Sequence, residues 1–246
     1  MSKAAIVSFS GGQDSTTCLF WALKNFDRVE TVGFNYGQKN NVELICRKEI
    51  LKKIQTQFPN FACRLGPDLV IDASTFGQVS SSALTGSGEA IVSEGKRGLP
   101  SSFVPARNLM FMTYIGARAY LRDIHTIITG VGQADFSGYP DCRRNTMDAM
   151  QKALSLGMDW PIEIVTPLMY STKAQTWELA YEVGDDELVD FIVKETHTCY
   201  EGDREHFHVW GYGCGHCPAC LLREKGFEEY QQSIVNSRKP PIPEVF

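Results

Sequence analysis

Residues 4–15 read AAIVSFSGGQDS and carry the strongest structural signal in this sequence. The apolar run at 4–7 predicts a buried strand, and residues 14–24 predict a helix with Asp14 or Ser15 as its N-cap. Between them, Gly11 and Gly12 allow a tight turn that brings backbone N–H groups close to an anion. The helix adds free N–H donors and the positive end of its dipole. The stretch therefore predicts a phosphate-binding loop, to which Ser10 and Ser15 could add hydroxyl donors.

The loop differs from two widespread phosphate-binding motifs. It has neither the G-x4-GK[ST] pattern of P-loop NTPases nor the GxGxxG pattern of dinucleotide-binding turns. A glycine turn that merely joins strand to helix is the alternative interpretation. The match of all six positions from Ser10 to Ser15, in a strand-loop-helix context, favours phosphate binding.

Strand-like and helix-like segments alternate along the rest of the chain, which is typical of a parallel sheet covered by helices. We expect further strands at 29–34, 69–71, 126–129 and 162–165, and helices at 40–57, 108–123, 145–156 and 174–183. Together they predict an α/β fold with a doubly wound, mostly parallel sheet, whose ligands bind beyond the carboxyl ends of the strands at the switch point. The Ser- and Gly-rich residues 73–103 predict either a substrate lid or a disordered insertion.

The composition excludes several classes of protein. The 246 residues carry a net charge of −5, and no apolar run approaches the roughly 20 residues of a membrane span. Without a secretory signal we expect a cytoplasmic protein with reduced cysteines. The negative charge argues against direct nucleic-acid binding. The local basic cluster, Arg47-Lys48 with Lys52-Lys53, is interpreted as a solvated helix face.

Four of the eight cysteines cluster near the C-terminus, at Cys199, Cys214, Cys217 and Cys220. The spacing C-x14-C-x2-C-x2-C can place four sulfurs around one ion, and four thiolates favour a closed, structural Zn²⁺ site. A site of three cysteines and one histidine, and an iron–sulfur cluster, are the alternatives. The candidate histidines are His197, His206, His208 and His216. We therefore expect a C-terminal helical zinc-knuckle region at 186–246, after a nucleotide-binding α/β domain at 1–185.

Three more motifs narrow the interpretation: VPARN at 104–108, DFSGYPDCR at 135–143 and TPLM at 166–169. With the SGGQDS loop and the cysteine cluster, the chain from about residue 4 to about residue 226 resembles the 7-cyano-7-deazaguanine synthases of the PP-loop ATP pyrophosphatase superfamily. The resemblance implies an adenine nucleotide alpha hydrolase-like fold, Mg²⁺, one structural Zn²⁺ and a homodimer. It also implies that ATP drives 7-carboxy-7-deazaguanine and ammonia to 7-cyano-7-deazaguanine (preQ0), a precursor of queuosine. The route runs through an adenylated carboxylate, an amide and its dehydration to the nitrile.

The resemblance also implies roles for individual residues. Asp14 would lie near Mg²⁺ and Lys173 would neutralise phosphate charge, as the two catalytic residues. The expected ATP-binding residues are Phe9, Ser10, Gly11, Gly12, Gln13, Asp14, Ser15, Thr16, Thr17, Cys18 and Leu19. The expected substrate-binding residues are Arg107, Asn108, Asp135, Phe136, Tyr139, Asp141 and Arg143. Among these, an aspartate would accept hydrogen bonds from the guanine-like N–H edge, an aromatic ring would stack on the base, and an arginine would hold a carboxylate or phosphate.

Two features depart from the family pattern. Ala106 stands where the family usually has Gly, which requires either a φ below zero or a strained turn. The first cysteine spacing, x14, is longer than usual.

Four other functions remain open: a related enzyme that stops at the amide, an ammonia-dependent NAD synthetase, a tRNA thiolase, and a zinc-knuckle interaction protein with a nucleotide-binding fold. The DFSGYPDCR motif argues against the NAD synthetase and the thiolase.

Overall fold

A computed structural model describes residues 3–38, 41–80, 82–85, 98–133 and 138–237 of the chain. Its central sheet has five strands in the order β3-β2-β1-β4-β5, and all four pairings are parallel. The strands are β1 (Ala4–Ser8), β2 (Arg28–Asn35), β3 (Leu65–Asp72), β4 (Thr126–Ile128) and β5 (Glu163–Val165). The doubly wound parallel sheet is confirmed, and its switch point lies between β1 and β4.

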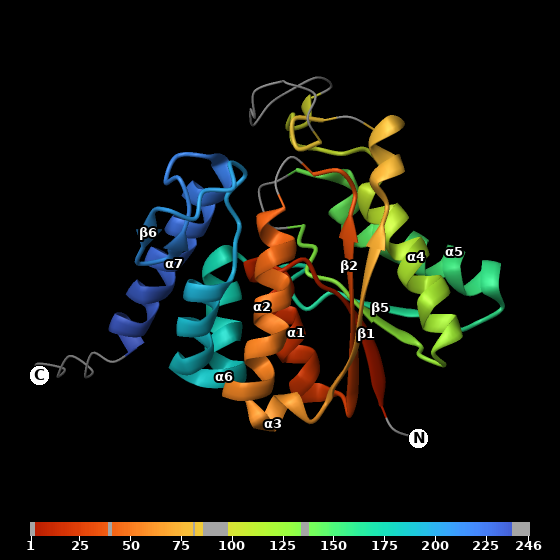
Figure 1. Ribbon diagram of the computed structural model, residues 1–246, viewed down its shortest axis with the longest axis horizontal. Coiled ribbons are helices and arrows are strands. Elements are labelled where there is room, and N and C mark those ends of the chain that lie inside the picture. The colour runs from red at the N-terminus through yellow and green to blue at the C-terminus, as the bar shows by residue number, and fades with distance from the viewer. Residues whose placement is uncertain (1–2, 39–40, 81, 86–97, 134–137, 238–246) are drawn as a thin grey trace, which may run out of the picture.

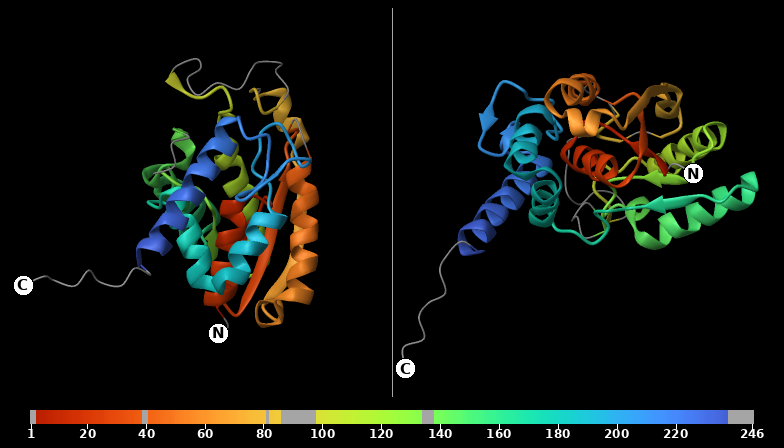
Figure 2. Two further views of the ribbon diagram at one scale, coloured as in Figure 1. Left: turned by 90° about the vertical axis from the view of Figure 1, so that its left-hand side faces the viewer. Right: turned by 90° about the horizontal axis from the view of Figure 1, so that it is seen from below.

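Helices cover both faces of this sheet (Figures 1 and 2). Helices α1, α2 and α6 lie on one side, and α4 and α5 lie on the other (Figure 1). The helices are α1 (Gln13–Asn25), α2 (Val42–Gln57), α3 (Pro59–Ala62), α4 (Arg107–Leu121), α5 (Arg144–Met158), α6 (Lys173–Glu195) and α7 (Pro218–Ser237), with short 3₁₀ turns at Ser74–Gln78 and Pro140–Cys142. None of the helices among the described residues is long and apolar enough to cross a membrane.

The alternation of side chains along β1 explains why the sheet is buried on both faces. Ala5 and Val7 belong to the core formed with α1, α2 and α6, whereas Ile6 belongs to the core formed with α4 and α5. All three side chains are fully buried. A continuous apolar run is what a parallel strand with two covered faces requires.

The C-terminal part of the chain packs on the α1 side of the sheet. Trp177 of α6 and Phe227 of α7 meet edge to face with ring centroids 5.0 Å apart. The segment between these helices carries a short hairpin, β6 (Phe207–His208) and β7 (Gly211–Tyr212). The expected domain boundary at 185/186 falls at a kink in α6, where Gly184 and Asp185 have non-helical φ and ψ. The division into two domains stays a prediction.

Four local expectations differ from the structure. Helix α1 begins at Gln13 with Gly12 as its N-cap, so neither Asp14 nor Ser15 caps it. Helix α6 continues to Glu195 instead of ending at 183, because the chain resumes helical geometry after the kink. Strand β3 begins at Leu65, four residues before the short apolar run that signalled it. Arg47 does not belong to a solvated face, since its side chain is fully buried.

Candidate active site and metal centre

The SGGQDS loop follows β1 and leads into α1, and its own hydroxyl groups hold its shape. The Ser15 hydroxyl accepts hydrogen bonds from the backbone N–H groups of Ser10 (3.2 Å) and Gly11 (3.3 Å) and donates to the carbonyl of Gly12 (3.2 Å). The Ser10 hydroxyl accepts from the N–H of Gly12 (3.2 Å). The two serines therefore brace the loop, besides any donors they offer to an anion.

Neighbouring segments fix the loop from two sides. The buried Arg47 of α2 donates from Nε to the carbonyl of Phe9 (2.9 Å) while it pairs with Asp68 at the edge of the sheet. The backbone N–H of His197 donates to the carbonyl of Gly11 (3.3 Å). Gly11 has φ +94°, and a Cβ there would lie 2.6 Å from the carbonyl oxygen of Glu43. Only glycine therefore allows the start of α2 to approach the loop this closely.

Asp14 and Lys173, 159 residues apart in the sequence, form an ion pair with Nζ and Oδ2 2.6 Å apart. The Lys173 side chain is only 10% exposed. Both residues line a hollow at the carboxyl end of β4, together with Gly130, Gly132, Leu168, Ser171 and Thr176. A Cβ at Gly130 would lie 3.1 Å from the backbone of Asp14, so α1 and β4 meet closely here. The other carboxylate oxygen of Asp14 is buried without a hydrogen-bond partner, which fits an oxygen ligand for Mg²⁺.

The remaining residues of the expected ATP-binding stretch lie along α1. The hydroxyls of Thr16 and Thr17 donate back to the carbonyls of Gly12 and Gln13. Cys18 and Leu19 are fully buried in the core, and burial raises the pKa of the Cys18 thiol. These four side chains position the helix behind the loop and do not face the hollow.

A second hollow opens on the other side of the loop, at the carboxyl ends of β1 and β2. Its lining is Ser8, Phe9, Ser10, Phe34, Tyr36, Gln38, Glu43, Leu44 and Phe111. Glu43, on the first turn of α2, is half-buried, and burial raises the pKa of its carboxyl group to about 7 despite the opposing charge of Arg107. Glu43 is not among the site residues predicted from the sequence. The sequence feature that could have pointed to it is its position after the end of the predicted strand at 29–34, because ligands bind beyond the carboxyl ends of such strands.

Arg107, on the first turn of α4, lies among aromatic side chains. Its guanidinium carbon is 5.6 Å from the centre of the Tyr36 ring and 5.9 Å from that of Tyr139. Its Nε is buried without a hydrogen-bond partner. Tyr139 is itself buried, with its hydroxyl 2.6 Å from that of Ser102. This arrangement leaves Arg107 with bonding capacity for an anion.

Asn108 and Asp141 hold the YPDC segment against α4. A carboxylate oxygen of Asp141 accepts from the backbone N–H of Asn108 (3.0 Å), and the amide nitrogen of Asn108 lies 3.3 Å from Sγ of Cys142. Both residues are buried. Their contacts are with each other and with the thiol of Cys142, so the structure gives them a positioning role.

Arg143 and Arg144 have different environments. Arg143 is exposed at the N-cap of α5, whereas Arg144 donates to the hydroxyl of Thr166 (2.9 Å) and pairs with Asp148. Arg144 is thus the arginine that reaches the carboxyl end of β5, whereas Arg143 is the one predicted from the sequence as a substrate residue. The expected substrate residues Asp135 and Phe136 lie outside the described residues.

Of the two conformations expected for Ala106, a φ below zero or a strained turn, the structure shows the strained turn. Ala106 precedes α4 with φ +62° and ψ 10°, in the left-handed region. An alanine there is less favourable than the glycine usual in the family.

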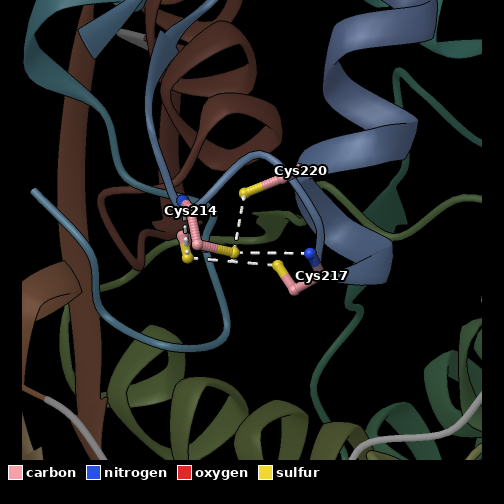
Figure 3. Close-up of side chains that lie close together, drawn as sticks. Cys214, Cys217 and Cys220 are labelled. Atoms are coloured by element: carbon pink, nitrogen blue, oxygen red, sulfur yellow. Dashed lines mark hydrogen bonds between the residues drawn. The ribbon is translucent and has the colours of Figure 1, made fainter. Parts of the chain in front are cut away.

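The four clustered cysteines converge, as Figure 3 shows for the three labelled ones. The sulfurs of Cys199, Cys214, Cys217 and Cys220 all lie within 4.8 Å of one another. The Cys214–Cys220 and Cys199–Cys217 sulfur pairs are 3.9 and 4.0 Å apart. A tetrahedral Zn²⁺ with Zn–S bonds of about 2.3 Å needs sulfurs about 3.8 Å apart. The cluster could therefore hold one zinc ion, and within the described ranges it is the one cluster of this kind.

The neighbouring histidines support the cysteine segments instead of joining the cluster. Ring nitrogens of His197, His208 and His216 lie 3.1, 2.9 and 2.9 Å from the carbonyls of Cys199, Gly213 and Cys214. His206 is exposed and pairs with Asp203. The four-cysteine ligand set fits this geometry better than a mixed one.

Two arginines hold the long segment between Cys199 and Cys214. Arg204 donates to the carbonyl of Lys194 (3.1 Å), and its guanidinium lies 4.5 Å from the centre of the Tyr212 ring. The fully buried Arg223 donates to the carbonyls of Trp210 (2.8 Å) and Ile192 (3.1 Å). The segment is therefore bonded to the ends of both α6 and α7.

Comparison with known proteins identifies the family of the chain. A model of the family described as "Queuosine biosynthesis protein QueC" matches residues 4–231. A 7-cyano-7-deazaguanine synthase of Caulobacter vibrioides (strain NA1000 / CB15N) is 54% identical over 231 residues, which cover 94% of this chain and 95% of the relative. One of Polaromonas sp. (strain JS666 / ATCC BAA-500) is 53% identical over 234 residues, 95% of this chain and 99% of the relative.

Solved structures with a similar arrangement are much more distant in sequence. A 4-thiouridine synthetase in complex with RNA and ATP is 16% identical, with a TM-score of 0.48 over 95% of this chain and 52% of that one. The NMN synthetase of Francisella tularensis is 12% identical, with a TM-score of 0.46 over 99% of this chain and 90% of that one. The family model and the near full-length relatives decide the assignment: the chain belongs to the QueC family of queuosine biosynthesis proteins.

Proposed function

We propose that this chain converts 7-carboxy-7-deazaguanine and ammonia to 7-cyano-7-deazaguanine and consumes ATP. Relatives that bear this activity in their names match nearly the whole chain at 50–54% identity. The structural observation that carries the proposal is the Asp14–Lys173 pair beside a glycine loop at the switch point of the sheet. The N–H groups of the loop can bind the phosphates of ATP, and the Lys173 ammonium can neutralise their charge.

In the first step, an oxygen of the substrate carboxylate attacks the α-phosphorus of ATP and pyrophosphate leaves. The N–H groups of Gly11 and Gly12 and the start of α1 would bind the phosphate oxygens. Lys173 would neutralise the developing negative charge. Asp14 would hold Mg²⁺, which supplies further charge neutralisation when bound.

In the second step, ammonia displaces AMP from the adenylated carboxylate and gives the amide. The amide oxygen then attacks the α-phosphorus of a second ATP and pyrophosphate leaves. The C–O bond breaks with loss of the second AMP, and the nitrogen releases its two protons to water, which leaves the nitrile. The carboxylate oxygen and the amide oxygen are both poor leaving groups, and each leaves as part of AMP after adenylation at the same site. The protein therefore mainly positions the reactants and stabilises charge.

The substrate would lie on the α4 side of the loop. Arg107 has an unpaired Nε and could hold the substrate carboxylate, with Tyr36 and Tyr139 beside it. Asp141 and Asn108 would keep this segment in place. Recognition of the base by Asp135 and Phe136 remains part of the proposal from sequence.

Three further parts of the proposal rest on sequence. We propose the free base and not tRNA as the substrate, which the net charge of −5 supports. We also propose a homodimer and a cytoplasmic location. Sedimentation equilibrium tests the dimer, and retention of tRNA at low salt would contradict the choice of substrate.

The direct test is incubation of the protein with Mg-ATP, ammonium and 7-carboxy-7-deazaguanine, followed by mass spectrometry of the product. The proposal expects the nitrile, with two AMP released per nitrile. Accumulation of the amide alone would identify a related enzyme that stops halfway. ATP binding without substrate-dependent AMP release would favour an interaction protein over an enzyme.

A further inference from the structure

Glu43 occupies a position for which the function proposed above provides no role so far. It lies on the first turn of α2 beside the SGGQDS loop, and a Cβ at Gly12 would lie 3.6 Å from its Oε1. The main chain at Glu43 also touches the loop, through the contact that only glycine at position 11 allows. The carboxylate therefore lies against Gly12 of the loop, whose N–H group is proposed above to bind a phosphate oxygen.

The surroundings of Glu43 lack charge compensation at short range. Among the described residues that line the hollow between the loop and β2, Glu43 is the one charged side chain. It forms no ion pair within 4.0 Å with any residue that the structure describes. Phe9, Phe34 and Phe111 supply apolar lining. A carboxylate in such a place is costly unless it serves a ligand or a reaction.

The charged and titratable groups that face Glu43 come from three directions. Asp14 on α1 raises its pKa, and Arg107 on α4 lowers it. Tyr36, after β2, also feels the Glu43 charge, which contributes to the raised pKa of that phenol. Burial is the largest effect and, together with the charge of Asp14, outweighs Arg107 and raises the pKa of Glu43 to about 7. The charges of Asp14, expected at the phosphate, and of Arg107, expected at the substrate carboxylate, thus both act on Glu43.

We propose that Glu43 is the proton acceptor in the amide-forming step, an inference that rests on the function proposed above. The nitrogen lone pair of ammonia forms the C–N bond with the adenylated carbonyl carbon. The C–O bond to AMP breaks, and its electron pair stays on the phosphate oxygen. One N–H proton moves to the Glu43 carboxylate, so that amide, AMP and a protonated Glu43 result, and the proton then passes to water.

A base suits this step because the attacking nitrogen must lose a proton to become a neutral amide. General base catalysis is most effective when the pKa of the base lies near the working pH, and it typically contributes about 10²–10⁴-fold. An ordinary exposed glutamate, with a pKa of about 4.3, would be a weaker base. The apolar hollow beside the loop therefore gives Glu43 the property that the step requires.

The test compares Glu43→Gln with Glu49→Gln, a matched change on the exposed side of the same helix. The first measurement is ATP–pyrophosphate exchange that depends on 7-carboxy-7-deazaguanine, without ammonia. This exchange reports adenylation alone. Its rate in E43Q should stay within about threefold of the rate in the parent protein, because Glu43 acts one step later. If the parent itself shows no substrate-dependent exchange, the proposed function fails and not the role of Glu43. If exchange is lost only in E43Q, Glu43 acts on the nucleotide or its metal and the proposal is overturned.

The second measurement is the rate of amide plus nitrile formation against pH, at a constant concentration of free ammonia. For the parent and E49Q we expect kcat to rise with pH and level off above about 7. For E43Q we expect kcat at pH 8 to fall about 10²–10⁴-fold and the pH dependence to disappear. An E43Q profile in which kcat still rises with pH would contradict the proposal. An increase in KM for the deazaguanine with unchanged kcat would also contradict it, and would indicate that Glu43 recognises the deazaguanine ring.

Thermal unfolding provides a readout independent of activity. The pKa of Glu43 is higher in the folded than in the unfolded protein, so its contribution to stability is present below about pH 4 and is lost as the pH rises through about 7. The midpoint of unfolding of E43Q should therefore rise relative to that of the parent between pH 5 and pH 8. A relative fall would show that a cation pairs with the ionised carboxylate, and the proton-acceptor role would be wrong.

Discussion

The phosphate loop and the cysteine cluster are both tight turns, but they owe their shape to different sources. Residues 10–15 are contiguous, and hydrogen bonds among Ser10, Gly12 and Ser15 hold the loop before any ligand binds. The cluster instead joins Cys199 to Cys214–Cys220, through backbone N–H···S hydrogen bonds of 3.3 and 3.5 Å and sulfur–sulfur distances of 3.9 and 4.0 Å. Protein hydrogen bonds, its own and those from Arg47 and His197, hold the loop without a ligand. Four converging thiolates instead need a cation to neutralise their charge.

A backbone hydrogen bond connects the two regions. The N–H of His197, two residues before Cys199, donates to the carbonyl of Gly11 in the loop. Disturbing the metal cluster should therefore weaken nucleotide binding, while disturbing the loop should leave the metal in place. This asymmetry can be tested from both sides.

The largest effect is expected for Cys217→Ala, which removes a buried ligand of the cluster. Structural zinc contributes about 10–16 kcal/mol in zinc-finger peptides, against about 5–15 kcal/mol for the net stability of a whole domain. We expect zinc-free, poorly soluble protein with weakened ATP binding, as measured by metal analysis and thermal unfolding. Cys63→Ala, at an exposed cysteine away from the cluster, is the control and should retain one zinc. A zinc-free C217A protein of full stability would show that the metal is not structural.

The next largest effect is expected for Lys173→Met. The variant loses the cation next to Asp14, and electrostatic groups of this kind are typically worth about 10²–10³-fold in kcat. We expect AMP release to fall by that factor while zinc content stays at one per chain. Lys152→Met, at an exposed lysine of α5, should be unaffected. Unchanged AMP release in K173M would remove Lys173 from the catalytic site.

Gly11→Ala should disturb the loop alone. The new Cβ would lie 2.6 Å from the Glu43 carbonyl, at a backbone φ of +94°. We expect a loss of about 1–3 kcal/mol in the free energy of unfolding and weaker ATP binding, with zinc retained. Gly157→Ala is the matched control, since a Cβ there meets no atom within 4 Å. If G11A lost zinc as readily as ATP binding, the two regions would be coupled in both directions.

The smallest effect is expected for Ala106→Gly. Glycine suits the left-handed conformation at φ +62° better than alanine does, so the free energy of unfolding should rise by about 0.5–1 kcal/mol. Chemical denaturation measures the change, and AMP release should stay the same. A destabilised A106G protein would indicate that the flexibility glycine adds to the unfolded chain outweighs the relieved strain.

The same contrast explains how much could be predicted from the sequence. The strand, loop and helix at 4–25 and the cysteine cluster have signals within short stretches, and the structure has them as expected. The burial of Arg47 was missed because its partners, Phe9 and Asp68, lie 38 and 21 residues away. Glu43 and Tyr36 were missed for the same reason, since the hollow exists only once β2, α2 and α4 pack together. Lys173 was predicted as a site residue from the family resemblance. Its ion pair with Asp14 depends on how α1 and α6 pack, which no local sequence pattern indicates.

The most direct measurement of the central claim uses 7-carboxy-7-deazaguanine with ¹⁸O in both carboxylate oxygens. If one site adenylates first the carboxylate and then the amide, each oxygen leaves on an AMP molecule. We predict that every AMP released during nitrile formation is heavier by one ¹⁸O, in a ratio of two labelled AMP per nitrile. Unlabelled AMP alongside labelled water or phosphate would contradict adenylation of the substrate at the SGGQDS loop.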